Sequence, residues 1–158
     1  MSNKVIGFTC GAMDLLHAGH VLMLKEAKSH CDHLVVGLHT DPTLDRATKN
    51  KPIQSLEERR IQLEGCKYVD EIVEYDTEAD LIELLDEYSN KYCQHFIRII
   101  GADYEGKDFT GKDLGIKVVY NSRNHNYSSS ELRKRIWREE TMNFAKLTGT
   151  NIIQWNKK

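Results

Sequence analysis

The 158-residue chain is poor in proline, has no paired cysteine motif and contains no long apolar run. Two prolines and ten glycines, with 40% hydrophobic and 29% charged residues, exclude collagen-like repeats and a disordered chain. None of the four cysteines lies two residues from another, which argues against a zinc knuckle or a redox dithiol. No stretch approaches the roughly 20 apolar residues that cross a bilayer, so no membrane span is expected.

The chain also lacks a large excess of positive or negative charge. Lys and Arg number 22 against 24 for Asp and Glu, a net charge of −2, which disfavours a protein built to coat nucleic acid. The first residues lack the apolar core and cleavage site of a signal peptide, so a cytoplasmic protein with reduced thiols is expected. The length favours one domain, predicted over residues 1–140, followed by a tail over 141–158.

Apolar runs and amphipathic segments alternate along the chain. Strands are predicted over 5–10, 33–39, 68–75, 95–100 and 116–120, and helices over 19–28, 55–64, from 77 through at least 88, and 128–138. Capping boxes, a Ser followed by Glu three residues later, start two of the helices, at Ser55 and Ser128. In the last helix, Leu132, Ile136 and Trp137 are expected to face inward. This alternation predicts an α/β, Rossmann-like, parallel five-stranded sheet with helices on both faces.

Ligands of such sheets bind at the carboxyl ends of the strands, where the strand order reverses. The segments that follow the first, second, fourth and fifth predicted strands are therefore the places to look for chemistry. They are residues 11–20, 41–51, 101–107 and 121–130, and all four are rich in polar side chains.

The first of these segments contains two histidines around a glycine, His17-Ala-Gly19-His20, where a strand passes into a helix. Backbone amides at a helix N-terminus favour an anion, and Gly19 would let a phosphate approach the backbone closely. Both imidazoles could donate to a phosphoryl oxygen. A metal site is the weaker alternative because Asp14 is the only third ligand nearby. Either histidine alone would more often be a core residue.

The segment after the fifth strand combines Arg123 with three serines, Ser128–Ser130. Arg123 can bind phosphate oxygens in bidentate fashion, and the serines supply hydroxyls and amides at another helix N-terminus. The alternative is that Ser128 only caps the helix while Ser129 and Ser130 are solvated.

Two further segments carry charge at strand ends. The basic run Arg46–Lys51 is either a solvated loop or a binding segment for an anionic second substrate. Asp103 can accept from a base or a ribose, or it caps a turn.

These residues resemble a known family. Asp14-Leu-Leu-His17-Ala-Gly-His20 is similar to the HxGH motif of the nucleotidyltransferase superfamily in its cytidylyltransferase form, and Arg123 with Ser128–Ser130 resembles that family's second motif. Residues 68–72 and 101–107 are similar to the glycerol-3-phosphate cytidylyltransferases. The resemblance covers roughly residues 4–138 and leaves out the tail.

The resemblance implies in-line attack by the phosphate oxygen of a small phosphomonoester, with glycerol 3-phosphate the first candidate, on the α-phosphate of CTP. Pyrophosphate leaves, giving a CDP-alcohol. His17 and His20 would stabilise the pentacoordinate phosphorus, Arg123 would hold the leaving phosphates, and Lys49 would reach the acceptor. Mg²⁺ would accompany the nucleotide, the protein would supply no metal site of its own, and the enzyme would be a homodimer.

The site residues carried over from the family fall into two further groups. Nucleotide contacts are expected from Gly11, Ala12, Met13, Asp14, Ala18, Gly19, Asp103, Asn124, Tyr127, Ser128, Ser129 and Ser130. Acceptor contacts are expected from Arg46 or Lys49 and from Lys67.

The chain departs from the family pattern at several of these positions. Ala12 and Met13 replace a hydroxyl residue and an aromatic one, the turn at 124–127 reads Asn-His-Asn-Tyr, and Lys67 replaces an arginine. Three alternatives therefore stay open. They are another acceptor (ethanolamine phosphate, choline phosphate or a sugar phosphate), ATP in place of CTP, and a nucleotide-binding module without catalysis.

Overall fold

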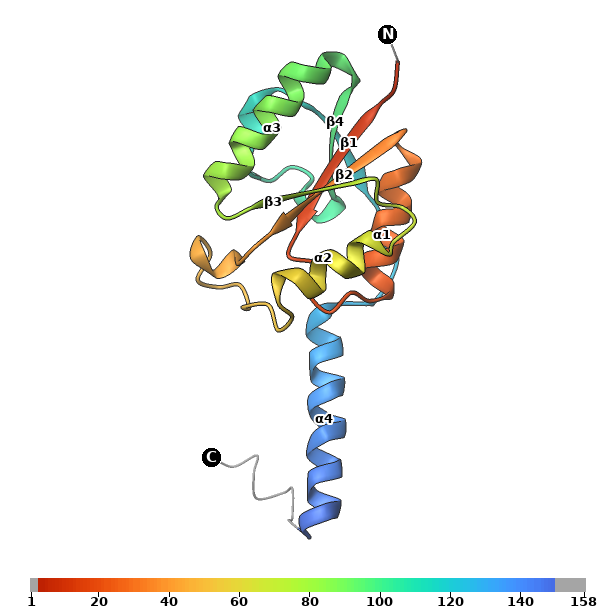
Figure 1. Cartoon of the computed structure of the whole chain (residues 1–158), viewed down its shortest axis with the longest axis vertical. Helices are drawn as coiled ribbons and strands as arrows, with labels where there is room; N and C mark the ends of the chain where they lie inside the picture. The colour runs from red at the N-terminus through yellow and green to blue at the C-terminus, as the bar shows by residue number, and fades with distance from the viewer. Residues whose placement is uncertain (1–2, 150–158) are drawn as a thin grey trace. The chain divides into compact units, whose positions relative to one another are not determined.

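A computed structural model describes residues 3–149 of the chain (Figure 1). The chain divides into two compact units, Met1–Asn126 and Tyr127–Lys158. The strands are β1 (Ile6–Gly11), β2 (His33–His39), β3 (Glu71–Tyr75), β4 (Phe96–Gly101) and β5 (Lys117–Asn121). The longer helices are α1 (Ala18–Ser29), α2 (Leu56–Glu64), α3 (Glu78–Tyr92) and α4 (Ser129–Thr148).

The five strands form one parallel sheet in the order β3-β2-β1-β4-β5. On one side of the sheet β2 and β3 follow β1 outward, and on the other side β5 follows β4 outward. The strand order therefore reverses between β1 and β4. Ligands of parallel α/β sheets bind outside the carboxyl ends of the strands at such a reversal. The predicted α/β sheet is confirmed, and the reversal lies beside β1, so the carboxyl end of β1 is where a ligand site is expected.

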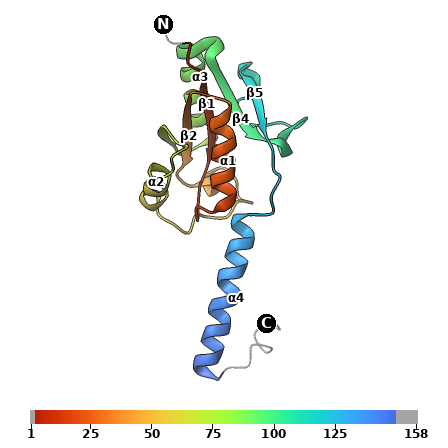
Figure 2. The same ribbon diagram turned by 90° about the vertical axis from the view of Figure 1, so that its right-hand side faces the viewer.

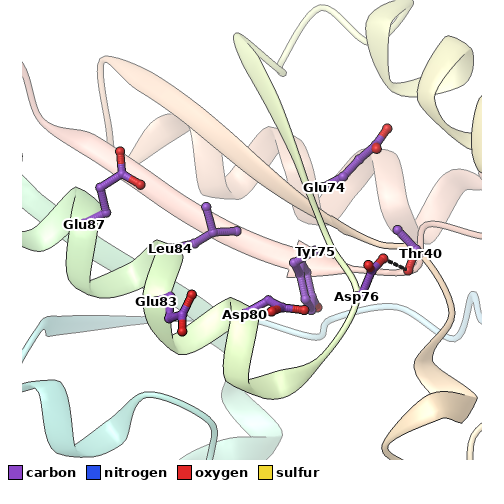
Figure 3. Close-up of a pocket in the computed structure, with 8 residues that line it drawn as sticks. All are labelled: Thr40, Glu74, Tyr75, Asp76, Asp80, Glu83, Leu84 and Glu87. Carbon is purple, nitrogen blue, oxygen red and sulfur yellow. Dashed lines mark hydrogen bonds between the residues drawn. The ribbon is translucent and has the colours of Figure 1, made fainter.

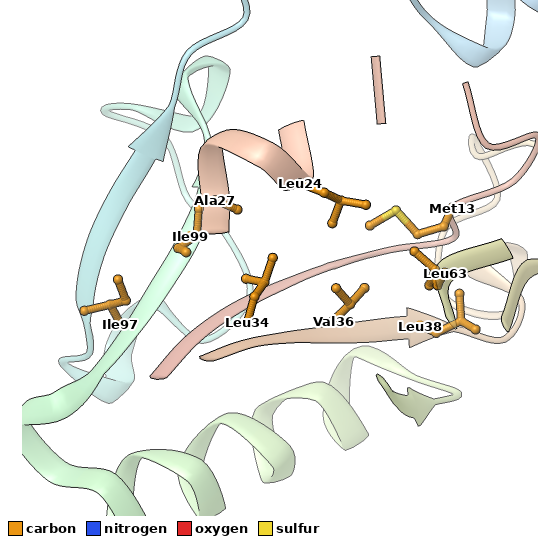
Figure 4. Packing of buried hydrophobic residues seen from close by; sticks show 9 residues of the cluster. All are labelled: Met13, Leu24, Ala27, Leu34, Val36, Leu38, Leu63, Ile97 and Ile99. Carbon is orange, nitrogen blue, oxygen red and sulfur yellow. The ribbon is translucent and has the colours of Figure 1, made fainter. Parts of the chain in front are cut away.

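Both faces of the sheet are covered (Figure 2). On one face, Leu24 and Ala27 of α1 and Leu63 of α2 pack with Leu34 and Val36 of β2 (Figure 4). On the other face α3 contributes three buried side chains to a second cluster, which also contains aromatic residues of the strands; these α3 residues are Leu81, Leu85 and Tyr88. Burying a side chain of this size contributes about 1.5–3 kcal/mol, so the two clusters hold the strand ends in fixed positions.

The helix starts follow the sequence signals. Ser55 accepts from the amide of Glu58, whose carboxylate accepts from the Ser55 amide, and Thr77 and Asp80 form the same reciprocal pair. Such caps satisfy amides that have no partner inside a helix. Ser128 likewise caps α4 by accepting from the amide of Glu131.

Helix α4 differs from its prediction in length and in burial. It ends at Thr148 rather than at residue 138, with Gly149 in a left-handed conformation, φ +69°, beyond its last residue. The expectation that Ile136 and Trp137 face inward is wrong, because both side chains are exposed. The reason is that α4 is the one described element of its unit and has no second element there to bury them.

The predicted tail begins within α4, and its residues from 150 onward lie outside the described part of the chain. No helix among the described residues has the length and apolar character needed to span a membrane.

Candidate active site

The turn between β1 and α1 is held in an unusual backbone shape. Met13 and Leu15 both have φ of +51°, a left-handed conformation that non-glycine residues rarely adopt. The Met13 side chain is buried in the core cluster, so only its backbone remains as the predicted nucleotide contact. A strained turn of this kind persists where its surroundings hold it, and two such supports are present.

The first support is the guanidinium of Arg59 in α2, which is 2% exposed. Its Nη1 donates to the carbonyl oxygens of Ala12 at 2.8 Å and His39 at 2.7 Å, and its Nη2 donates to that of Thr40 at 2.6 Å. Its Nε donates to the carbonyl of Gln54 at 3.2 Å. One buried side chain therefore ties the end of β1 to the end of β2.

The second support is Asp14, whose carboxylate is buried. It accepts from the amide of Ile53 at 3.0 Å and from that of Gln54 at 2.9 Å, while the Gln54 side chain accepts from the amide of Leu15 at 2.6 Å. The carboxylate of Asp14 thus holds the turn against the segment that enters α2. The predicted contact of Asp14 with a nucleotide stays a prediction. The bonds described above show that the residue stabilises the turn.

His17 is the N-cap of α1. Its Nδ1 atom accepts from the amide of Gly19 at 3.0 Å, and its own backbone N–H donates to Nδ1 of His20 at 3.4 Å. Because Nδ1 of each ring faces a backbone donor, the proton of each neutral imidazole belongs on Nε2. Both rings therefore present an N–H donor on the side away from the helix backbone.

The two imidazoles lie against each other, with 4.0 Å between ring centroids and 33° between ring planes. Burial is the main cause that lowers the pKa of His20 to about 4, the neighbouring His17 adds to this shift, and Asp14 partly opposes it. His20 is therefore a neutral hydrogen-bond donor at pH 7. With His20 neutral, the pair avoids the repulsion that two imidazolium ions would have at this separation.

The space beside Gly19 is filled rather than open. A Cβ atom built on Gly19 would lie 2.8 Å from Cε1 of His17 and 3.0 Å from Cε1 of His125. Its amide is also engaged by His17. The expectation that a phosphate reaches the bare backbone at Gly19 is therefore modified, because imidazole rings cover that backbone and their nitrogens are the groups a ligand would meet.

The two predicted acceptor-binding residues of the basic segment after β2 differ in their contacts. Arg46 forms an ion pair with Glu78 at 2.9 Å and donates to Thr110 at 3.4 Å, which anchors the segment to α3. The Lys49 side chain is exposed and has no ion pair among the described residues. Of the two, Lys49 is the cation that is available for an anionic ligand.

The ends of β4 and β5 bring Asp103 and Arg123 together. Arg123 Nη1 lies 3.4 Å from Asp103 Oδ2, and both side chains are largely exposed. An exposed ion pair of this kind contributes about 0–1 kcal/mol to stability. Breaking it so that the guanidinium can bind a phosphate therefore costs little free energy. Asn124 follows as an exposed residue. Tyr127, Ser129 and Ser130 belong with Ser128 to the second unit, at the start of α4.

One predicted residue lies at the wrong edge of the sheet. Lys67 precedes β3, and in a parallel sheet the residues before a strand lie at the amino edge, opposite the ligand-binding edge. Its neighbour Asp70 pairs with Lys28 near the C-terminal end of α1, which confirms the placement. The structure therefore does not bring Lys67 to the two histidines of the same chain.

A pocket of about 410 Å³ opens elsewhere, between β3 and α3 (Figure 3). Its lining contains five carboxylates, with Thr40, Tyr75 and Leu84 completing it; the acidic residues are Glu74, Asp76, Asp80, Glu83 and Glu87. This charge opposes a polyphosphate. This pocket is therefore an unfavourable place for the phosphate groups of a nucleotide.

Within residues 3–149, no three His, Cys, Asp or Glu side chains converge as a metal site. Two carboxylates are among the predicted nucleotide contacts: that of Asp14 accepts from backbone amides, and that of Asp103 accepts from Arg123. Mg²⁺ usually keeps several waters and binds phosphates with one or two carboxylates. The Mg²⁺ ion that would accompany the nucleotide stays a prediction.

Two residues of this region were not found from the sequence. Arg59 reads as one more charged residue in the helix start Leu-Glu-Glu-Arg-Arg, and nothing in that pattern marks it as buried. His125 lies in the segment that was singled out, but the resemblance gives no role to its position. Its contact with Gly19 appears only when α1 and β5 are placed side by side.

Comparison with known proteins agrees with this geometry. The family model for cytidylyltransferase-like proteins matches residues 8–135. The chain belongs to the cytidylyltransferase-like family. The match begins within β1 and includes the His17–His20 turn, Arg123 and the first residues of α4, so the predicted resemblance to nucleotidyltransferases is confirmed.

Two curated relatives and one solved structure illustrate the range of this family. The chain is 37% identical to a probable ethanolamine-phosphate cytidylyltransferase of Encephalitozoon cuniculi over 81% of this chain and 38% of that protein. It is also 37% identical to the bifunctional protein HldE of Wolinella succinogenes, over 84% of this chain and 27% of that protein. The chain thus spans well under half the length of either relative.

The solved structure is a lipopolysaccharide core biosynthesis protein from Thermoplasma volcanium. It superposes with a TM-score of 0.58 and 27% identity, covering 79% of this chain and 99% of that one.

Proposed function

We propose that this chain is a cytidylyltransferase that transfers CMP from CTP to a small phosphomonoester, releasing pyrophosphate. The observation that carries the proposal is the pair of imidazoles at the N-terminus of α1, each with Nδ1 facing a backbone N–H. This arrangement fixes two Nε2–H donors in place before any ligand binds. Donors arranged in advance around a phosphoryl group stabilise the charge that develops in its transition state.

The chemistry would be a direct displacement with no covalent intermediate. The acceptor's phosphate oxygen attacks the α-phosphorus of CTP, the bond from that phosphorus to the bridging oxygen breaks, and pyrophosphate leaves with the electron pair. His17 and His20 donate to the oxygens of the five-coordinate phosphorus. Such transfers depend on positioning and electrostatic stabilisation, which this site can supply without a nucleophile of its own.

The remaining roles go to cations at neighbouring strand ends. Arg123, released from Asp103, would hold the leaving phosphates, and Lys49 would bind the acceptor's phosphate. Bound Mg²⁺ would neutralise part of the phosphate charge. The serines at the start of α4 are expected to complete the nucleotide site, and a homodimer is the expected assembly.

Glycerol 3-phosphate was the first candidate acceptor, and the comparisons support ethanolamine phosphate beside it. That acceptor is named in the Encephalitozoon relative. Both are small phosphomonoesters that one exposed lysine could hold. A direct assay with each of them and CTP, following pyrophosphate and the CDP-alcohol, tests the proposal and chooses between them.

A second candidate is transfer of a nucleotide to a sugar phosphate, with CTP or ATP as donor. It is favoured by the likeness to a solved protein of lipopolysaccharide core biosynthesis. The histidine site would work in the same way, and only the acceptor and the base would change. Product analysis with a sugar phosphate and each nucleotide separates this candidate from the first.

A further inference from the structure

The segment that leaves β5 is fastened along α1. The side chain of Asn121 donates to the carbonyl of Met23 at 3.1 Å. The hydroxyl and the amide of Ser122 both donate to the carboxylate of Glu26, at 2.7 and 2.6 Å. These bonds fix the path of the chain beside the helix just before it reaches Arg123.

The same segment then returns to the first turn of α1 at His125. Residues 122–124 and 126–128 are exposed, whereas His125 is half-buried and its Nδ1 atom is shielded from solvent. Its Cε1 atom lies 3.0 Å from the position that a Cβ of Gly19 would take, and Cε1 of His17 lies 2.8 Å from that position. The rings of His17 and His125 are therefore neighbours over Gly19.

We propose that His125 is a third imidazole of the phosphate site, and that its Nε2 atom contacts the phosphate chain of the bound nucleotide. The inference rests on the proposed function, because it needs a nucleotide at the N-terminus of α1. Since Nδ1 is shielded from solvent, the phosphate contact is assigned to Nε2, the other ring nitrogen. His125 lies two residues from Arg123, so one short segment would contribute both a guanidinium and an imidazole.

Two roles for His125 can be separated by variants. If the ring only packs over Gly19, His125→Phe keeps that role, since it retains a planar ring of similar size. If Nε2 contacts phosphate, His125→Phe loses the contact while His125→Gln retains a donor near the same place. Hydrogen bonds to charged groups are worth enough to change affinity about tenfold or more. His30, exposed at the other end of α1, provides the control variant His30→Gln.

The test is binding of CTP with Mg²⁺, without acceptor, to the full chain. Calorimetry gives the Kd of each variant, and ¹⁵N NMR follows every imidazole through a titration of the unsubstituted protein. We expect the signals of His17, His20 and His125 to shift and that of His30 to stay. The Kd should rise about tenfold for His125→Phe, and stay near the original for His125→Gln and His30→Gln.

The outcomes separate this inference from the proposed function. The role of His125 would be overturned if the NMR signals of His17 and His20 shift while that of His125 does not, or if the Kd for CTP is unchanged in His125→Phe. Either result would leave the proposed role of His17 and His20 standing. If the ¹⁵N signals of all three imidazoles stay unshifted with CTP and also with ATP, the proposed function is overturned together with this inference.

Discussion

The backbone N–H of His17 donates to Nδ1 of His20 at 3.4 Å, while Nδ1 of His17 accepts from Gly19 at 3.0 Å. The same two side chains thus cap the helix and form the candidate catalytic pair. Capping holds each ring in one tautomer, and that tautomer is the one that presents an Nε2–H donor. A substitution at His17 that removes both the cap and the Nε2–H donor therefore changes helix stability and chemistry together, and tests must separate the two.

His17→Asn separates them. Asparagine is a good N-cap and can accept from the first-turn amides, so the free energy of unfolding should stay close to that of the original protein. The Nε2–H donor is lost, so kcat should fall by about 10²–10³-fold. His17→Ala should show the same loss of kcat together with about 1 kcal/mol of lost stability. Chemical denaturation and steady-state kinetics give both quantities, and near-normal kcat in His17→Asn would remove His17 from the mechanism.

The titration of His20 provides a second test. Its pKa is lowered to about 4 in the folded protein, against 6.5 for the ordinary group. Between these values the unfolded chain takes up a proton that the folded one does not. The contribution of His20 to stability is therefore complete above about pH 6.5 and declines as the pH falls towards 4.

NMR measures this directly. The ¹⁵N signals of His20 should keep the pattern of the neutral Nε2–H tautomer from pH 8 down to about pH 5. A titration midpoint above pH 6 would show that the ring is neither buried nor capped as described.

Arg59 is expected to matter for stability more than its neighbour Arg60. Arg59→Met keeps an unbranched apolar side chain but leaves the carbonyls of Ala12, His39 and Thr40 without their donor, at a cost on the order of 3 kcal/mol. Arg60→Met is the matched control, since Arg60 makes a half-exposed ion pair with Glu74 worth about 0–1 kcal/mol. Urea unfolding of both variants measures the difference, and equal free energies of unfolding would contradict the bridging role of Arg59.

Lys49→Ala should raise the KM for the acceptor about tenfold and leave the KM for the nucleotide nearly unchanged, because one charged hydrogen bond to the acceptor's phosphate is lost. Lys25→Ala, an exposed lysine on α1, serves as the control and should change neither constant. A rise confined to the nucleotide KM would show that the segment after β2 binds the other substrate.

Local signals in the sequence were sufficient for the fold. The capping box at Ser55, the helix start at Thr77 and the apolar runs that became β1, β2 and β4 depend on neighbouring residues only, and each appears close to where it was predicted. The strand order then explains why segments distant in sequence meet at the end of β1. The His17–His20 turn could be found because its residues are adjacent in the chain.

What the sequence could not show depends on long-range contact. Arg59 is buried because four carbonyls converge on it from three segments, and His125 reaches Gly19 because Asn121 and Ser122 are fixed to α1. Lys67 was assigned to the site by its motif, but the direction of β3 places it at the other edge. Helix α4 continues to Thr148 because no breaking residue interrupts it, and the resemblance ended before that point.

The most direct test is pyrophosphate release by the full chain with Mg²⁺, using CTP and ATP against glycerol 3-phosphate, ethanolamine phosphate, choline phosphate and a sugar phosphate. The account predicts release only when a nucleotide and an acceptor are both present, with CTP and one small phosphomonoester giving the fastest rate and a CDP-alcohol as product. Tight binding of CTP without pyrophosphate from any pair would contradict it and indicate a nucleotide-binding protein without transferase activity.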